Sequence, residues 1–412
     1  MLLEDKEYRG VEYRLFPGTR TKARQLAGTA GACRFVWNYF LAKNKEEYKQ
    51  AQESDGKKPS ISFFSLGKQF TQLRKEIDWL SEYSFGIVRY SLKHQADAWQ
   101  GFFKGVRKHP KFHSRYGNRP SFTIPENVKI KDGRLFIPKV GWMQMRRKGG
   151  NPYPDGRPIR ATVKKAGRYW NVSVCYEIDA PKRTENGVAV GVDLNTYNAA
   201  WTDTTGERGM LDVPKLDKKE IRIRRYQRKL ARQQKGSNRR RVTKRKIAKW
   251  KRKQKNCRKN QAHQNSRFLA NRAEALVRED LKLKNMTTSS KGTAENPGKN
   301  VNAKAGLNRA MLNASHGRFN QYCDYKFETV VGVDPRYTSQ TCNACGHVDK
   351  ANRQSQCRFK CVSCGHADHA DLNASANILA SGIGAAGRRE AFSLETSMNR
   401  QIDLAETDNG YY

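Results

Sequence analysis

The sequence predicts a multidomain α/β protein, in which a helical bundle is inserted into a small antiparallel β-barrel and an α/β domain follows. Apolar residues repeat at helical spacing between about residues 19 and 103, and with a period of 2 between about residues 120 and 178. From residue 185 onward, strand-like and helix-like stretches alternate. A length of 412 residues is sufficient for several such domains.

The N-terminal half opens with a predicted strand, EYRGVEYRLF, at residues 7–16. Three helices should follow, the first of which carries the apolar stripe Leu26, Ala30, Cys33, Trp37 and Phe40. The short segments PSFTIP, GRLFIP and VGWMQM and the alternating RYWNVSVCYEI predict strands. Because the opening strand can join them, we expect a barrel made of residues 1–17 and 119–184, with a helical domain, residues 18–118, inserted.

The second half begins after APKRTENG with GVAVGVDLN, which predicts a mostly buried strand ending at Asp193, and YNAAWTD, its hairpin partner. After a helix near residues 262–274, ALVREDLKL predicts another strand, which carries Glu279. A polar loop at residues 286–305, a helix to about residue 326 and the strand FETVVGVD should follow. Asp371 is expected to open the last helix, and residues 385–412 to form a loosely attached tail.

Charge is the most unusual property of the chain. Eighty Lys and Arg residues against 39 Asp and Glu leave a net charge of +41, and the self-repulsion of so many cations favours a polyanionic partner such as nucleic acid. Residues 215–259 hold 23 basic and two acidic residues and predict two antiparallel helices separated by KGSN. A solvated face is the alternative. The candidate nucleic-acid contacts are Arg222, Arg224, Arg225, Arg228, Lys229, Arg232, Arg239, Arg240, Arg241, Lys244 and Arg245.

The sequence lacks the apolar segments of a membrane or secreted protein. It has no apolar run of eighteen residues, and the N-terminal MLLEDKEYRG has no apolar signal region. We therefore expect a cytoplasmic protein with no membrane partner. In that compartment its nine cysteines should be thiols or metal ligands rather than disulfides.

Four cysteines follow the spacing C-x2-C-x15-C-x2-C: Cys342, Cys345, Cys361 and Cys364. Two such turns present four thiolates to one Zn²⁺ ion, and a closed tetrahedral shell leaves no position for substrate. The pattern predicts a structural zinc site. The alternative is four unrelated core cysteines.

Three acidic residues stand at the ends of predicted elements: Asp193, Glu279 and Asp371. Carboxylates from separate elements are the ligands that a pair of Mg²⁺ ions needs for phosphodiester hydrolysis. From spacing alone, each is more often an ordinary surface or capping residue, and Asp371 in particular can be a helix N-cap.

The segments GVDLN, REDLKLKNM, DPRYTSQTCNACG and FKCVSCGHADHADLNASANI resemble the RuvC-like nuclease and zinc-ribbon blocks of the TnpB family. These proteins are transposon-associated RNA-guided endonucleases related to the smallest type V CRISPR effectors. CRFVWNYFLA, WLSEYS and GRLFIPKVGWMQM resemble the family's N-terminal half, so the resemblance covers roughly residues 7–385. Two positions depart from the family pattern: Asn195 replaces a common Gly, and Arg278 stands where members are often apolar.

The resemblance implies an RNase H-like (RuvC) nuclease domain in residues 185–337 and 367–384, with a zinc ribbon inserted at residues 338–366. The barrel becomes the wedge domain and the helical bundle the recognition domain. Asp193, Glu279 and Asp371 become the catalytic triad, which holds two Mg²⁺ ions, and the four cysteines hold one Zn²⁺ ion.

The resemblance also implies the partners. A noncoding guide RNA from the transposon end would direct cleavage of double-stranded DNA, next to a short flanking motif, at the single RuvC-like site. We expect a monomer, with a dimer as the alternative, in the prokaryotic cytoplasm and associated with the nucleoid. Two rival functions are a nuclease-dead RNA-guided repressor, which would lack the triad, and a zinc-ribbon DNA-binding protein without guide RNA.

Overall fold

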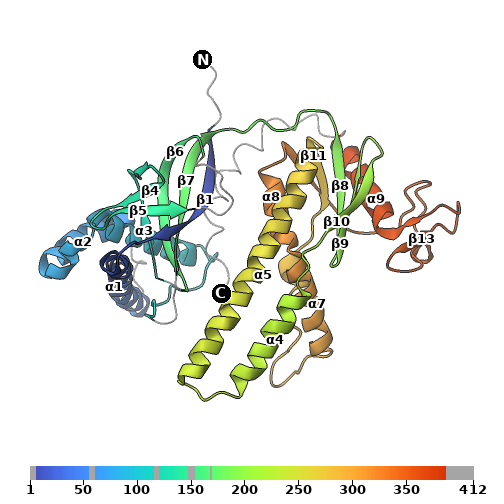
Figure 1. The fold of residues 1–412 in the computed structure, drawn as a ribbon. Helices are drawn as coiled ribbons and strands as arrows, with labels where there is room; N and C mark the ends of the chain where they lie inside the picture. Colours follow the sequence, from blue (N-terminus) through green and yellow to red (C-terminus); the bar gives the residue numbers. More distant parts are fainter. Residues whose placement is uncertain (1–5, 55–60, 116–119, 147–153, 168, 387–412) are drawn as a thin grey trace. The chain divides into compact units, whose positions relative to one another are not determined.

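The computed structural model describes residues 6–54, 61–115, 120–146, 154–167 and 169–386 (Figure 1). Most of the tail expected at residues 385–412 lies outside these ranges. The chain divides between Pro181 and Lys182 into two compact units. Each unit is built around its own sheet.

The first unit contains a seven-stranded antiparallel sheet in the order β2-β6-β7-β1-β5-β4-β3. Its strands are β1 (Lys6–Phe16), β2 (Ser121–Ile124), β3 (Ile130–Lys131), β4 (Arg134–Ile137), β5 (Gly141–Arg146), β6 (Arg157–Ala166) and β7 (Tyr169–Asp179). The N-terminal strand β1 lies between β7 and β5, so that residues more than a hundred positions apart share one sheet.

The helices of the first unit lie in sequence between β1 and β2: α1 (Arg20–Glu53), α2 (Phe63–Glu76), the short 3-10 helix η1 (Asp78–Glu82) and α3 (Phe85–Phe103). The predicted stripe of α1 is buried in one hydrophobic core together with residues of the sheet. The apolar spacing of Leu66, Phe70, Leu73, Ile77 and Leu80 predicts one helix through Leu80. This prediction is wrong, because extended backbone at Ile77 ends α2 and Leu80 lies in η1.

The second unit contains a five-stranded sheet in the order β10-β9-β8-β11-β12. Its strands are β8 (Ala189–Leu194), β9 (Asn198–Asp203), β10 (Arg208–Asp212), β11 (Ala275–Glu279) and β12 (Thr329–Val333). The first three form an antiparallel meander, whereas β11 runs parallel to both β8 and β12. The carboxyl ends of β8, β11 and β12 therefore meet at one edge of the sheet.

Helices cover both faces of this sheet (Figure 1). One face packs against α5 (Asn238–Ala270) and α8 (His316–Asp324), and the other against α9 (Ala370–Ala386). Two glycines allow α9 to lie close to the strands. A Cβ added at Gly191 of β8 would meet the Ser375 carbonyl oxygen at 2.5 Å, and one at Gly382 of α9 would meet Val277 of β11 at 2.3 Å.

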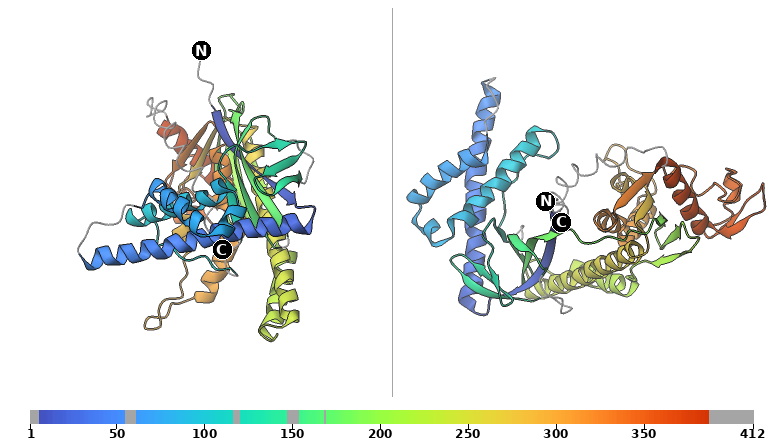
Figure 2. Two further views of the ribbon diagram at one scale, coloured as in Figure 1. Left: turned by 90° about the vertical axis from the view of Figure 1, so that its left-hand side faces the viewer. Right: turned by 90° about the horizontal axis from the view of Figure 1, so that it is seen from above.

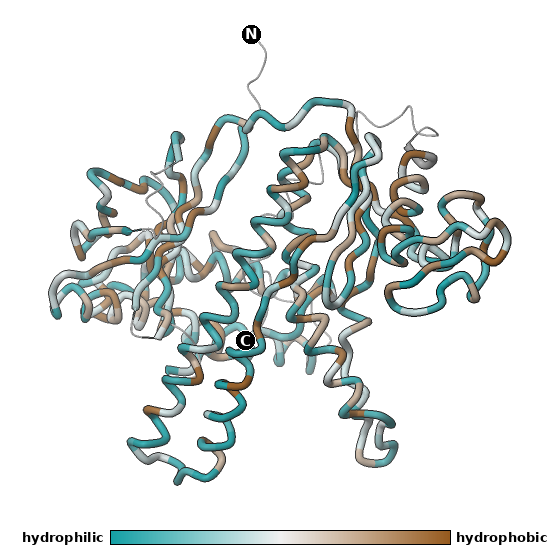
Figure 3. The backbone as a smooth tube through the Cα atoms, turned by 45° about the vertical axis from the view of Figure 1, so that its right-hand side comes forward, coloured by the Kyte–Doolittle hydropathy of each residue, from teal (hydrophilic) through white to brown (hydrophobic). Residues whose placement is uncertain are grey.

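The basic segment forms a hairpin of two helices, α4 (Asp217–Ala231) and α5, as predicted. The separate helix expected at residues 262–274 is wrong, because α5 is one helix of 33 residues that continues to Ala270. No Gly or Pro interrupts it. In Figure 3 the two strongly hydrophilic helices lie side by side, in contrast to the hydrophobic strands of the sheet.

The remaining helices of the second unit are α6 (Leu283–Met286), α7 (Val301–Ala314) and α8. The single helix expected to end near residue 326 is instead two helices, because Ser315 adopts a left-handed conformation with φ 68° between α7 and α8. Figure 2 gives two further views of these elements. None of the helices in the described ranges has the length and apolar character needed to cross a bilayer.

Candidate active site and metal centre

Two of the three predicted acidic residues lie at the carboxyl ends of neighbouring parallel strands. Asp193 is the penultimate residue of β8, and Glu279 is the last residue of β11. The register pairs Arg278 with Val192, which places the next residue of each strand side by side. Because side chains alternate between faces, Asp193 shares the face of Gly191, which α9 covers.

The third acidic residue reaches the same place from α9. Asp371 is the second residue of this helix, whose next turns pack on β8 at Gly191. The burial of Asp193 and then the negative charges of Glu279 and Asp371 raise the pKa of Asp193 to about 7. The structure thus brings the three carboxylates into one electrostatic cluster.

Amide side chains of the β8–β9 turn hold two of these carboxylates. Asn195 Nδ2 donates to Asp193 Oδ2 at 2.9 Å, and Asn198 Nδ2 donates to Asp371 Oδ2 at 3.2 Å. Asn195 stands where the resemblance predicts glycine, so the departure provides a hydrogen-bond donor beside the carboxylate. Asp193 and Asp371 are only 8% and 4% exposed, and these bonds fix their orientation.

An arginine from the cysteine-rich segment completes the surroundings of Asp371. Arg353 Nη2 donates to Asp371 Oδ1 at 3.2 Å, and the positive charge also acts to lower the pKa of Asp193. Sequence reasoning missed Arg353. The sequence shows only a basic residue between Cys345 and Cys361, and this does not indicate that Arg353 contacts Asp371.

Glu279 is hydrogen-bonded by Thr338, a residue just before the first cysteine of the cysteine-rich segment. The Thr338 hydroxyl donates to Glu279 Oε1 at 2.7 Å. Burial raises the pKa of Glu279, and this hydrogen bond acts in the opposite direction. The carbonyl of Thr338 accepts a 2.9 Å bond from Asn377 Nδ2 of α9. Thr338 therefore links the β11 carboxylate to the helix that carries Asp371.

Two buried asparagines of α9 anchor the first cysteine turn. Asn373 Nδ2 donates to the Thr341 carbonyl at 2.8 Å, while its Oδ1 accepts from the Asn343 amide at 3.0 Å. Asn377 Nδ2 also donates to the Thr341 carbonyl, at 2.7 Å. Both asparagines were missed as functional residues. Their spacing of four places both amides on one face of the helix, which is the signal that could have identified them.

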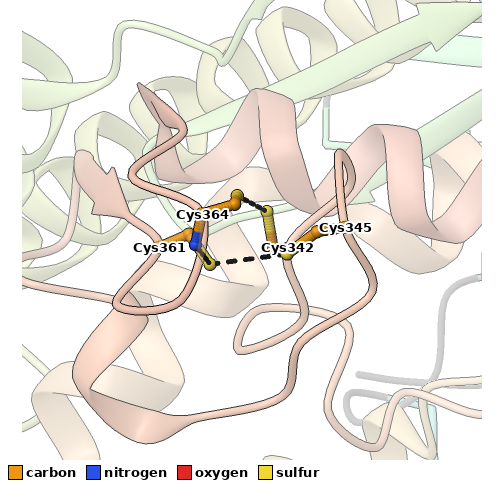
Figure 4. Close-up of side chains that lie close together, drawn as sticks. All are labelled: Cys342, Cys345, Cys361 and Cys364. Carbon is orange, nitrogen blue, oxygen red and sulfur yellow. Dashed lines mark hydrogen bonds between the residues drawn. The ribbon is translucent and has the colours of Figure 1, made fainter.

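The four predicted cysteines converge on one point (Figure 4). Cys342 and Cys364 have sulfur atoms 3.7 Å apart, and those of Cys345 and Cys361 are 3.6 Å apart. The sulfur atoms of the four thiols all lie within 4.8 Å of one another, close enough to bind a single metal ion. The short antiparallel strands β13 (Arg358–Lys360) and β14 (Ala367–His369) flank Cys361 and Cys364. Such a four-thiol cluster can bind zinc.

The candidate nucleic-acid contacts lie on α4, on α5 and in the loop between them, and all except Arg240 are exposed. Arg240 donates to the carbonyls of Leu230 and Gln233, so it closes the turn between the helices. Arg224 pairs with Glu220 at 3.2 Å, and Arg222 lies 4.6 Å from the centre of the Trp250 ring. The basic hairpin, which we define as residues 217–270, therefore combines cations that bond within the hairpin with cations that are exposed at its surface.

Comparison with known proteins gives three matching family profiles: "Probable transposase" over residues 173–290, "Cas12f1-like, TNB domain" over residues 316–378 and "Helix-turn-helix domain" over residues 8–53. Within this last range the structure contains β1 and one uninterrupted helix, α1. A Cas12f1 chain solved by cryo-EM in an sgRNA–target DNA complex has a TM-score of 0.54 at 12% identity. The superposed region covers 87% of this chain and 83% of the Cas12f1 chain, which shows a shared mixed α/β multidomain fold.

Two relatives match almost the whole chain. "Putative RNA-guided DNA endonuclease InsQ" of Escherichia coli (strain K12) is 32% identical, over 92% of this chain and 93% of its own length. "Putative RNA-guided DNA endonuclease" of Streptomyces pristinaespiralis is 27% identical over 92% and 90%. The fold, the carboxylate cluster and these relatives define a nuclease. The chain belongs to the TnpB family.

Proposed function

We propose that this protein is an RNA-guided DNA endonuclease that hydrolyses phosphodiester bonds at a site formed by Asp193, Glu279 and Asp371. The observation that carries the proposal is the convergence of three carboxylates from β8, β11 and α9. Burial, and then the negative charges of Glu279 and Asp371, raise the pKa of Asp193 to about 7. Buried carboxylates that repel one another are stabilised by a bound cation. Two relatives that match nine-tenths of the chain are named RNA-guided DNA endonucleases, which supports the choice of substrate.

The residues at this site fit two Mg²⁺ ions. All three side chains offer oxygen ligands, and their shared negative charge favours divalent cations that prefer such ligands. When bound, the ions would activate a water molecule and stabilise the leaving 3′ oxygen. The chain itself orients the ligands through Asn195, Asn198 and Thr338. With a pKa of about 7, Asp193 can lose its proton to solvent near neutral pH, so that its carboxylate would be free to bind a cation.

The two sheets support the proposed domain assignment. We assign residues 185–337 and 367–384 to a RuvC-like nuclease domain, since its sheet has the order 3-2-1-4-5 with the carboxylates on strands one and four and on the last helix. In the first unit, the pairing of β1 with β5 and β7 supports a wedge domain of residues 1–17 and 119–184. The helices between them form the recognition domain, residues 18–118.

The zinc ribbon, residues 338–366, has a structural role in this proposal. Four thiolates would complete the coordination of one Zn²⁺ ion and leave no position for substrate. The ribbon is bonded to α9 through Asn373 and Asn377, and to Glu279 through Thr338. A rigid zinc-bound segment would therefore help to position the carboxylates of Glu279 and Asp371.

The basic hairpin is the proposed site for nucleic-acid phosphates, because exposed guanidinium and ammonium groups outnumber acids there. A noncoding RNA from the transposon end would select the DNA target by base pairing, next to a short flanking motif that the first unit reads. The single nuclease site would then cut the two strands in turn.

The test is to purify the full-length chain, sequence the RNA that accompanies it and challenge the complex with a plasmid carrying the matching target. We expect one defined RNA and linear plasmid with Mg²⁺, and intact plasmid with EDTA or a scrambled target. Target binding without any cleavage would support an RNA-guided repressor instead. DNA binding without a defined RNA would support a zinc-ribbon DNA-binding protein.

A further inference from the structure

The turn between β8 and β9 controls two of the three carboxylates. Residues 195–198 form this turn, which is closed by a 3.0 Å bond from the Asn195 amide to the Asn198 carbonyl. The side chains at its two ends hold Asp193 and Asp371. A displacement of this turn would therefore alter the orientation of both carboxylates.

One buried side chain holds the turn from the opposite side. His316 Nε2 lies 2.9 Å from the Asn195 carbonyl oxygen, and His316 is 6% exposed. A carbonyl only accepts, so Nε2 carries the proton and donates. Burial lowers the pKa of His316, which favours the neutral ring.

The backbone around His316 is built to place it there. Ser315, with φ 68°, ends α7 and makes His316 the first residue of α8. A non-glycine residue in this conformation costs about 1 kcal/mol or more, and such strain often occurs where a side chain has a positional role.

A small cavity lies beside His316 and is also lined by residues of the neighbouring helix α5. Its volume is about 20 Å³, and its lining includes Leu194, Asn198, Asn265 and His316. The ring nitrogen Nδ1 has no hydrogen-bond partner among the described residues. The cavity has room for one water molecule and offers it polar partners. The bond donated by His316 therefore holds the turn beside a small cavity.

We propose that His316 is a positioning residue for the metal site: its Nε2–H holds the Asn195 carbonyl, and thereby sets the orientation in which the turn presents Asp193 and Asp371. The inference rests on the proposed metal site. Groups that orient metal ligands in this way typically change metal affinity by about 10- to 100-fold when they are removed.

The test compares His316→Phe, which keeps a ring without a donor, with His316→Gln, whose amide can donate to the same carbonyl. Calorimetry on the full-length chain, freed of nucleic acid, measures Mg²⁺ affinity. We expect His316→Phe to lose about 10-fold or more in affinity, and His316→Gln to stay within about threefold of wild type. Cys323→Ala, also buried in α8, is the control: it should lower the melting temperature and leave Mg²⁺ affinity unchanged.

Wild-type Mg²⁺ affinity in folded His316→Phe would overturn the inference. Should that variant not fold, nitrogen-15 spectra of the wild-type ring decide: Mg²⁺ should shift the Nε2–H resonance, and an unmoved resonance would overturn the inference. If the wild-type chain binds Mg²⁺ no better than Asp193→Asn does, the proposed metal site itself fails, which is a distinct result.

Discussion

The hydroxyl of Thr338 donates a 2.7 Å hydrogen bond to Oε1 of Glu279, 59 residues earlier in the chain. The same residue accepts a bond from Asn377 of α9 through its carbonyl. Thr338 lies four residues before the first zinc-ribbon cysteine. The segment that leads into the four-cysteine cluster therefore connects two carboxylate-bearing elements, and damage to this cluster should reach the proposed nuclease site.

Replacing Thr338 with valine should slow DNA cleavage about 10-fold, because one hydrogen bond to a buried carboxylate contributes about 1.5 kcal/mol. Valine keeps the shape of threonine and removes the donor. Single-turnover cleavage measures the effect, and Thr338→Ser, which retains a hydroxyl, should remain within about threefold of wild type. Equal rates for valine and wild type would show that this bond does not position Glu279.

Replacing Gly191 with alanine should destabilise the second unit by about 1–3 kcal/mol, because the new Cβ would lie 2.5 Å from the Ser375 carbonyl oxygen and α9 would have to shift. Denaturant unfolding measures this loss. Gly306→Ala is the matched control: nothing lies within 4 Å of its Cβ, so the substitution in α7 should stabilise by about 0.5–1 kcal/mol. Equal effects of the two substitutions would mean that α9 does not pack this tightly.

Replacing Cys364 with serine should remove the bound zinc, about one ion per chain, and lower the thermal stability of the second unit, because structural zinc contributes directly to folding. Elemental analysis and thermal unfolding measure the two effects. Cys357→Ser is the control, since Cys357 is exposed in the same ribbon and outside the four-thiol cluster. Zinc-free wild-type protein that still cleaves DNA would refute this role.

Replacing Arg225, Arg228 and Lys229 with alanine should weaken nucleic-acid binding without changing which target is selected, because phosphate contacts carry no sequence information. Each lost contact should reduce the salt slope of log K by about 0.7–0.9, hence by about 2–3 for the three exposed residues. Arg224 is left out because it pairs with Glu220. Affinities measured across a salt series provide the test.

The charge-conserving change of Arg225 and Arg228 to lysine should keep the wild-type slope, since lysine retains the positive charge. An unchanged slope in the alanine variant would mean that this part of the basic hairpin is a solvated face.

The carboxylates Asp193, Glu279 and Asp371 were predicted through the resemblance to the TnpB family, because spacing alone also allows ordinary surface or capping residues at these positions. The four cysteines were predictable because tetrahedral coordination imposes their spacing. Arg353 and Thr338 were not, since their roles depend on tertiary contacts with Asp371 and Glu279 that leave no local pattern.

The missed element boundaries have a similar cause. In α5 few residues are buried, so the apolar periodicity that would show one continuous helix is weak. The helix contains no Gly or Pro and continues to Ala270. The break between α7 and α8 falls at Ser315, a residue type that does not usually mark the end of a helix as Gly or Pro does. Strand β10 has only five residues, of which Leu211 alone is buried, which is too short a pattern to recognise.

Cleavage by Asp193→Asn, measured beside target binding by the same RNA complex, tests the central claim most directly. Asparagine keeps the size of the side chain and removes the charge that a catalytic cation would need. We expect the cleavage rate to fall at least about 1,000-fold, with affinity for RNA and target DNA within about twofold of wild type. Cleavage at a near wild-type rate would contradict the assignment of Asp193, Glu279 and Asp371 as the nuclease site.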